Sequence, residues 1–97
     1  MSVKVMLAFH LKPDLVEEVK TSLRELLPDT RAFEGCEDIS VVQSQEDPNT
    51  LLIVEQWAAR ENYEAYFKWR TDTGAIAMVN DMCTEPLQPK YYDFVRV

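Results

Sequence analysis

The sequence predicts a single α+β domain of ferredoxin-like topology that spans residues 1–97, and three observations predict it. Four segments have the alternation or the composition of β-strands, and two longer segments have apolar residues at helical spacing. Their order is strand, helix, strand, strand, helix, strand, which is the split βαβ arrangement. The length of 97 residues is enough for one modest hydrophobic core and too short for two.

The first strand is predicted at residues 2–11, where apolar residues recur at every second position. One face of this strand carries Val3, Val5, Leu7, Phe9 and Leu11. A helix follows, because Pro13 and Asp14 are residues favoured in the first turn of helices. Its apolar stripe contains Leu15, Val16, Val19, Leu23, Leu26 and Leu27. We expect Pro28 to end this helix, because proline lacks the backbone N–H that continuation requires.

The middle of the chain predicts a β-hairpin. A β-branched stretch at residues 39–45 and an apolar stretch at residues 50–57 flank the turn sequence Asp47-Pro48-Asn49. Residues 51–54 are apolar on both faces of the second strand, which predicts that both faces of this strand are covered.

The last third of the chain predicts a helix, a break at residues 71–74, a short second helix and a final strand at residues 90–97. The first of these helices begins near Ala59, and one side of it carries Tyr63, Tyr66, Phe67 and Arg70. The short helix carries Ile76, Val79 and Met82, and we expect Pro86 and Pro89 to end it.

A ferredoxin-like sheet has helices on only one face. The other face would be wet, although the strand at residues 50–57 is apolar on both sides. A second copy of the chain is the simplest cover for such a surface, so the sequence predicts a homodimer.

The charge balance argues against two classes of partner. The chain has 17 acidic and 10 basic residues, a net charge of −7, whereas nucleic acids and anionic membranes are bound mainly through basic residues. The only glycines are Gly35 and Gly74, so neither a dinucleotide-binding fingerprint nor a phosphate-binding loop can be written in this sequence.

The sequence also argues against a bound metal. A zinc or catalytic metal site needs three or four suitable ligands, and the chain has one histidine and two distant cysteines. Cys36 and Cys83 form no Cys-x-x-Cys pair and are too few for a secreted disulfide framework. With no apolar stretch of about 20 residues either, we expect a cytoplasmic protein that is not bound to a membrane.

Three motifs together resemble the antibiotic biosynthesis monooxygenase family of dimeric α/β barrels. They are Arg31-Ala-Phe-Glu-Gly-Cys36, Glu55-Gln-Trp57 and Tyr63-Glu-Ala-Tyr-Phe-Lys-Trp-Arg70, and the resemblance extends over nearly the whole chain. It implies a small homodimer with a pocket between the sheet and the helices of each subunit. In several family members that pocket oxygenates a quinol or a polycyclic phenol without a cofactor.

The implied reaction agrees with a chain that is poor in metal ligands and glycine. A phenol or hydroquinone that loses its proton is electron-rich enough to reduce dioxygen. The protein then supplies a dry pocket, a proton acceptor and hydrogen bonds to the oxyanion, and no metal or flavin is required. We therefore expect a cofactor-independent monooxygenase that acts on a small aromatic or polycyclic substrate.

His10 and Trp57 are two candidate site residues. Histidine exchanges protons near neutral pH, so His10 is the first candidate for the proton acceptor, although a lone histidine near a strand end is more often simply exposed. Trp57 could stack on an aromatic substrate through its flat ring, and its alternative role is a core side chain.

Tyr63, Tyr66 and Arg70 share one helix face, where their hydroxyls and guanidinium could converge on a phenolate. The alternative is amphipathic packing with polar tips in solvent, which we favour for Tyr63. In the catalytic interpretation Trp57 and Tyr66 orient the ring, Arg70 stabilises the oxyanion and His10 or a water takes the proton. Glu55 is interpreted as structural, with an arginine partner, Arg31 or Arg70.

Two other functions remain open. Many family members have a histidine at the position of Tyr66 and another near Arg70, and this chain has neither. That difference is compatible with a non-catalytic small-molecule-binding or dimerisation module. The third interpretation, haem binding and degradation, is disfavoured because related barrels use a helix histidine as the iron ligand.

Overall fold

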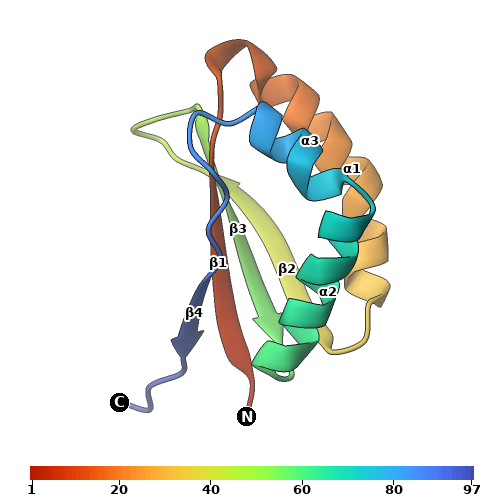
Figure 1. Ribbon diagram of the computed structural model, residues 1–97. Helices are drawn as coiled ribbons and strands as arrows, with labels where there is room; N and C mark the ends of the chain where they lie inside the picture. The colour runs from red at the N-terminus through yellow and green to blue at the C-terminus, as the bar shows by residue number, and fades with distance from the viewer.

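The computed structural model describes all residues 1–97 and contains one four-stranded sheet (Figure 1). Strands β1 (Val3–His10), β2 (Cys36–Gln43), β3 (Thr50–Trp57) and β4 (Lys90–Asp93) are arranged in the order β2-β3-β1-β4. Every neighbouring pair is antiparallel. The predicted α+β ferredoxin-like fold is therefore confirmed.

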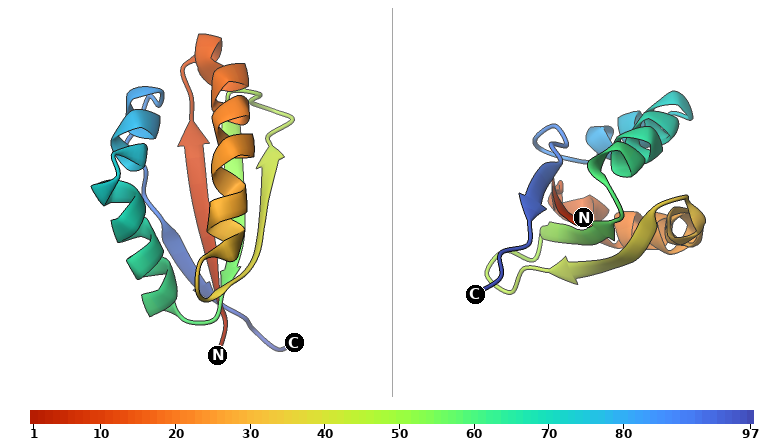
Figure 2. Two further views of the ribbon diagram at one scale, coloured as in Figure 1. Left: turned by 90° about the vertical axis from the view of Figure 1, so that its right-hand side faces the viewer. Right: turned by 90° about the horizontal axis from the view of Figure 1, so that it is seen from below.

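The helices lie together on one face of the sheet (Figures 1 and 2). A short 3-10 turn (Pro13–Leu15) leads into α1 (Val16–Ala32), and α2 (Arg60–Asp72) and α3 (Ala75–Asp81) follow the hairpin. The predicted break between the last two helices is confirmed at Gly74, which has a φ of +85°. None of these helices is both long and apolar enough to cross a lipid bilayer.

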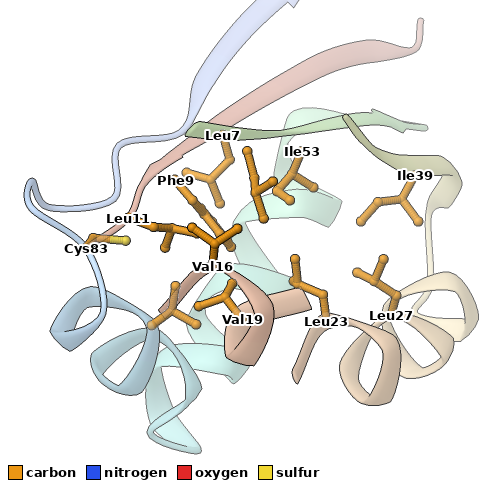
Figure 3. Close-up of a cluster of buried hydrophobic side chains, with 12 residues drawn as sticks. Leu7, Phe9, Leu11, Val16, Val19, Leu23, Leu27, Ile39, Ile53 and Cys83 are labelled. Atoms are coloured by element: carbon orange, nitrogen blue, oxygen red, sulfur yellow. The ribbon is translucent and has the colours of Figure 1, made fainter. Parts of the chain in front are cut away.

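The main core lies between α1 and the helix-facing side of the sheet (Figure 3). Alternate residues of β1 point into it because side chains of a strand alternate between its two faces. The 12 buried residues of this cluster are Leu7, Phe9, Leu11, Val16, Val19, Leu23, Leu27, Ile39, Leu51, Ile53, Val79 and Cys83.

A second, aromatic cluster lies where β3 enters α2. Trp57 and Tyr63 pack edge to face with ring centroids 5.6 Å apart. Phe33 follows α1, and its ring centroid lies 6.2 Å from that of Trp57 and 5.4 Å from that of Tyr66. Phe33 also stacks on the half-exposed Trp69. The cluster therefore ties the end of α1 to α2 and the sheet.

The expectation that Pro28 ends the first helix is wrong. The helix continues to Ala32, and Pro28 lies within its last turns. Proline removes one helical hydrogen bond, here the one to the carbonyl of Arg24, which is an exposed residue, and the helix continues without it. The carbonyl of Leu26 accepts hydrogen bonds from Thr30 Oγ1 at 3.4 Å and from Arg70 Nη2 at 2.8 Å.

Two strand ends also differ from the sequence prediction. β2 begins at Cys36, where it pairs with Trp57, and not at residue 39. β4 ends at Asp93 because its partner β1 begins at Val3, so later residues have no neighbouring strand on that side. Neither end is marked by a change in local composition.

The sheet face opposite the helices is uncovered in the single chain. Met6 of β1 and Leu52 and Val54 of β3 lie half-buried on it, and Val42 and Tyr92 on the flanking strands are exposed. Both chain termini lie at one end of this sheet (Figure 1). The apolar side chains predicted for this face are thus present without a cover.

The two glycines allow a test of the turn before β2. Both have positive φ, at which a Cβ costs about 1–2 kcal/mol. A Cβ at Gly35 would also collide with Asn62 of α2, whereas one at Gly74 would meet nothing within 4 Å. We expect Gly74→Ala to lower the unfolding free energy by about 1 kcal/mol and Gly35→Ala by about 2–4 kcal/mol, measured by urea denaturation. Equal losses of unfolding free energy in the two variants would contradict the close contact between Gly35 and Asn62.

Candidate functional site

A small apolar cavity lies between the sheet and the three helices. It has a volume of about 60 Å³, and 14 of its 16 lining residues are hydrophobic. The polar groups on its wall are Glu55, Arg70 and the hydroxyls of Tyr63 and Tyr66. The volume is below the roughly 150 Å³ of a protein cavity that holds benzene, so an aromatic ring requires the cavity to widen.

Arg70 is the most connected residue of this wall. Its guanidinium donates from Nη2 to the Leu26 carbonyl at 2.8 Å and to Thr30 Oγ1 at 3.1 Å, and from Nε to Tyr66 Oη at 3.0 Å. Tyr66 Oη and Thr30 Oγ1 lie 2.7 Å apart and also share a hydrogen bond. The structure therefore brings Tyr66 and Arg70, predicted to share one helix face, into direct contact.

No carboxylate compensates the charge of Arg70. Its side chain is only 6% exposed, yet none of the ion pairs in the structure includes it. Its Nη1 donates no hydrogen bond to the protein, and its guanidinium carbon lies 4.5 Å from the ring centroid of Trp69. A buried cation held by neutral groups favours an anion nearby.

Glu55 lies on the same cavity wall and is 2% exposed. The predicted partnership with Arg31 or Arg70 is wrong: the carboxylate instead accepts a hydrogen bond at Oε1 from Trp57 Nε1 at 3.1 Å. Burial raises the pKa of Glu55 to about 7, and the hydrogen bond from Trp57 opposes part of that rise. The side chain can therefore exchange a proton near neutral pH.

Tyr63 is fully buried, and its hydroxyl has no hydrogen-bond partner. Burial raises the pKa of this phenol, and the nearby Glu55 adds to the rise. A buried hydroxyl without a partner is costly, and a polar ligand in the cavity would relieve that cost. The hydroxyl of Tyr63 therefore stays protonated and can act as a donor.

Trp57 and His10 are not brought into this cavity. Trp57 is 0% exposed, and its indole N–H is already bound to Glu55. His10 lies on the opposite face of the sheet, because it alternates with the core residue Phe9. The Nδ1 atom of His10 is 3.3 Å from Thr50 Oγ1, and its Nε2 is 3.8 Å from Glu85.

The largest hollow is elsewhere. It is an open groove of about 550 Å³ between α1 and the edge strand β2, with Lys20, Arg24 and Arg31 among its lining residues. Neither Glu55 nor Arg70 lines it, so it is separate from the buried polar groups. No group of three or more His, Cys, Asp or Glu side chains is placed to hold a metal ion.

The comparisons with known proteins agree with this architecture. The sequence model of the family described as antibiotic biosynthesis monooxygenase matches residues 2–71. The chain belongs to the antibiotic biosynthesis monooxygenase family. Residues 2–71 include β1, α1, the hairpin and nearly all of α2, and so contain Glu55, Tyr66 and Arg70. No curated protein matches the chain in sequence.

Solved structures share the fold at low sequence identity. A conserved protein from Methanosarcina mazei Go1 is 21% identical with a TM-score of 0.85, and the match covers 95% of this chain and 91% of the other. Rv0793 from Mycobacterium tuberculosis is 20% identical with a TM-score of 0.86, covering 100% and 98%. A structure described as antibiotic biosynthesis monooxygenase is 22% identical with a TM-score of 0.85, covering 97% and 99%.

Sequence reasoning missed Thr30 and the cavity position of Glu55. Thr30 is fully buried and continues the apolar stripe of α1 at helical spacing from Leu23 and Leu27. A polar residue on an apolar stripe was the available signal, because a buried hydroxyl requires a partner. Glu55 carried a similar signal, since it alternates with Ile53 and Trp57 on the buried face of β3.

The Thr30 network can be tested by an isosteric substitution. Thr30→Val leaves Tyr66 Oη and Arg70 Nη2 with one partner fewer in a buried site, so we expect a loss of about 1–3 kcal/mol in unfolding free energy. The matched control is Thr21→Val on the same helix, where an exposed hydroxyl donates to the Glu17 carbonyl. The unfolding free energy of Thr21→Val, measured by urea denaturation, should lie within about 0.5 kcal/mol of the wild-type value. A Thr30→Val protein as stable as the control would refute the network's contribution.

The raised pKa of Glu55 predicts a pH dependence of stability. Because the folded-state pKa, about 7, exceeds the unfolded value of 4.5, the folded protein holds a proton that the unfolded chain releases between these values. Stability should fall by about 1.4 kcal/mol per pH unit between pH 5 and pH 7, and this contribution should stay constant above. In urea denaturation, Glu55→Gln should lose this decrease in unfolding free energy between pH 5 and pH 7. The exposed control Glu61→Gln should keep it. An identical slope in Glu55→Gln would exclude Glu55 as its source.

Proposed function

We propose that the protein is a cofactor-independent monooxygenase that oxidises a small phenol or hydroquinone in the cavity between sheet and helices. The observation that carries the proposal is the buried guanidinium of Arg70, which forms no ion pair and lies on the wall of an apolar cavity. Such a group stabilises negative charge where it develops, because the surroundings are dry and the donors are already oriented. Family membership supports the same reaction class.

The reaction balances with dioxygen as the only oxidant. The phenol loses its hydroxyl proton, and the resulting phenolate gives electrons to dioxygen. A carbon–oxygen bond then forms at a ring carbon that carries hydrogen, which yields a hydroperoxide. Loss of water from that hydroperoxide breaks the O–O bond and leaves a quinone. One oxygen atom enters the product and the other leaves as water.

The dimensions of the cavity favour a single-ring substrate over a polycyclic one. A volume of about 60 Å³ must increase to accept even one ring, and each further ring requires more displacement of packed side chains. In this proposal Tyr66 and Arg70 contact the oxygen of the substrate. Tyr63 donates to it through its free hydroxyl, and Trp57 supports the wall from behind through Glu55.

The proposal includes a homodimer that joins two uncovered sheet faces. Met6, Leu52 and Val54 lie on the face opposite the cavity, and Val42 and Tyr92 are exposed beside them. Pairing through this face removes apolar area from water and leaves the helices and the cavity outside the interface. We place the dimer in a reducing cytoplasm, in keeping with the free thiols of Cys36 and Cys83.

A non-catalytic binding module is the second candidate. It is favoured by the internal bonding of Arg70, whose three hydrogen bonds are made without any ligand. In that case aromatic ligands would raise the melting temperature of the protein, and none would be converted to product.

Oxygen consumption by metal-free protein tests the function. With a panel of single-ring hydroquinones and phenols, we expect turnover above the autoxidation rate in air and none under anaerobic conditions. Arg70→Gln should lower kcat about 100-fold, the effect typical of removing an oxyanion donor. Arg24→Gln, which changes an exposed arginine of α1, should have no effect. Melting curves confirm that each variant is folded. Wild-type rates equal to autoxidation, together with stabilisation by ligands, would favour the binding module.

A further inference from the structure

We propose that Glu55 is the proton acceptor of this cavity. This inference rests on the proposed oxidation and assigns the step that the sequence left to His10 or to water. The assignment comes from the position of Glu55 in the fold and from the groups that surround it.

The position of Glu55 is unusual for a structural carboxylate. It lies on the helix-facing side of β3, between Ile53 and Trp57. The other buried residues of this strand are all hydrophobic. A carboxylate buried for structure is normally paired with a cation or held by several donors. Glu55 has no ion pair and accepts a single hydrogen bond, from Trp57 to Oε1. Oε2 has no hydrogen-bond partner in the protein, and the side chain lines the cavity.

No other group on the cavity wall can accept the proton. Arginine stays protonated in proteins, so Arg70 serves only as a donor. Tyr66 Oη is engaged between Thr30 and Arg70. Burial raises the pKa of Tyr63, which keeps that hydroxyl protonated. Glu55 is the one side chain of the wall that can gain and lose a proton near neutral pH.

The groups packed around Glu55 carry no charge that would fix its ionisation. Cys36 on β2, Tyr63 on α2 and Tyr91 on β4 face it, and burial raises the pKa of each of these three. All three are therefore neutral at pH 7. The nearest polar donor is the Trp57 indole, which holds Oε1 and leaves Oε2 to meet the substrate.

The proton balance closes within one turnover. The hydroxyl proton of the phenol moves to Glu55 Oε2, which forms a neutral carboxylic acid and a phenolate beside Arg70. The phenolate gives electrons to dioxygen as a ring carbon bonds to oxygen, and Glu55 returns its proton to the resulting peroxide, which forms the ring-bound hydroperoxide. When the O–O bond breaks, the departing hydroxide takes the proton released from the ring carbon and leaves as water. Glu55 ends the cycle as the carboxylate.

The first test does not depend on turnover and uses 4-nitrophenol, whose phenolate form absorbs visible light. We expect wild-type protein at pH 7 to convert bound 4-nitrophenol to the phenolate, with a smaller phenolate fraction in Glu55→Gln. Glu61→Gln, an exposed carboxylate of α2, should match the wild type. In parallel, Trp57 fluorescence should titrate near pH 7 in the wild type and lose that transition in Glu55→Gln. Unchanged ionisation of the bound probe in Glu55→Gln would overturn the assignment.

The second test uses the reaction. With a hydroquinone that the wild type oxidises, we expect kcat/KM to rise with pH to a plateau with a midpoint near 7. Glu55→Gln should lower kcat by about 100-fold to 10,000-fold, remove the midpoint and change KM little, whereas Glu55→Asp should recover part of kcat. A Glu55→Gln protein with wild-type kcat and pH profile would overturn the role of Glu55 and leave the oxidation standing. Wild-type protein without turnover would overturn the oxidation, and the nitrophenol result would still decide proton transfer.

Discussion

The buried guanidinium of Arg70 connects parts of the molecule that are far apart in sequence. It joins α2 to Leu26 and Thr30 of α1, residues 44 and 40 positions earlier. These contacts lie beside Pro28, where the helix has lost one of its own hydrogen bonds. With α1 extended to Ala32, Phe33 reaches Trp57, Tyr66 and Trp69. The aromatic cluster and the cavity wall both depend on that placement.

Arg70 and Glu55 have opposite charges, line one cavity and do not form an ion pair with each other. A direct pair would neutralise both groups and lower the pKa of the carboxyl. Kept apart, the guanidinium leaves a positive site without a counterion, and the carboxyl keeps a pKa of about 7. Neither the missing counterion of Arg70 nor the raised pKa of Glu55 favours stability at neutral pH, and both features support the proposed binding and proton transfer.

The sequence predicted the elements whose signal is local, and it failed where distant contacts decide the outcome. Alternation in β1, the apolar stretch of β3 and the turn at Asp47-Pro48-Asn49 were sufficient to predict the hairpin and the sheet. The helical spacing of Tyr66 and Arg70 was sufficient to predict that they meet. The continuation of α1 beyond Pro28 was not predictable, and the hydrogen bond that Arg70 of another helix donates to the Leu26 carbonyl is not local in sequence either.

The partner of Glu55 was missed for a related reason. Trp57 is two residues away on the same strand face, and its indole N–H donates to Glu55. An arginine was predicted instead, because a buried carboxylate is usually paired with a cation. His10 is the reverse case, because its chemistry attracted a catalytic prediction while alternation with Phe9 already placed it on the other face. The chemistry of histidine therefore pointed to the sheet face opposite the cavity.

The walls of the cavity differ in how strongly they are held. Helix α1 contributes five buried residues to the fold, whereas α3 contributes only Val79 and is joined to α2 through Gly74. A segment with little buried apolar surface opens at lower free energy than one with much. Of the elements around the cavity, α3 is therefore the one whose displacement costs least when an aromatic ring enters. Tyr66 and Arg70 lie on α2 and are anchored to α1, so such a displacement leaves the polar wall in place.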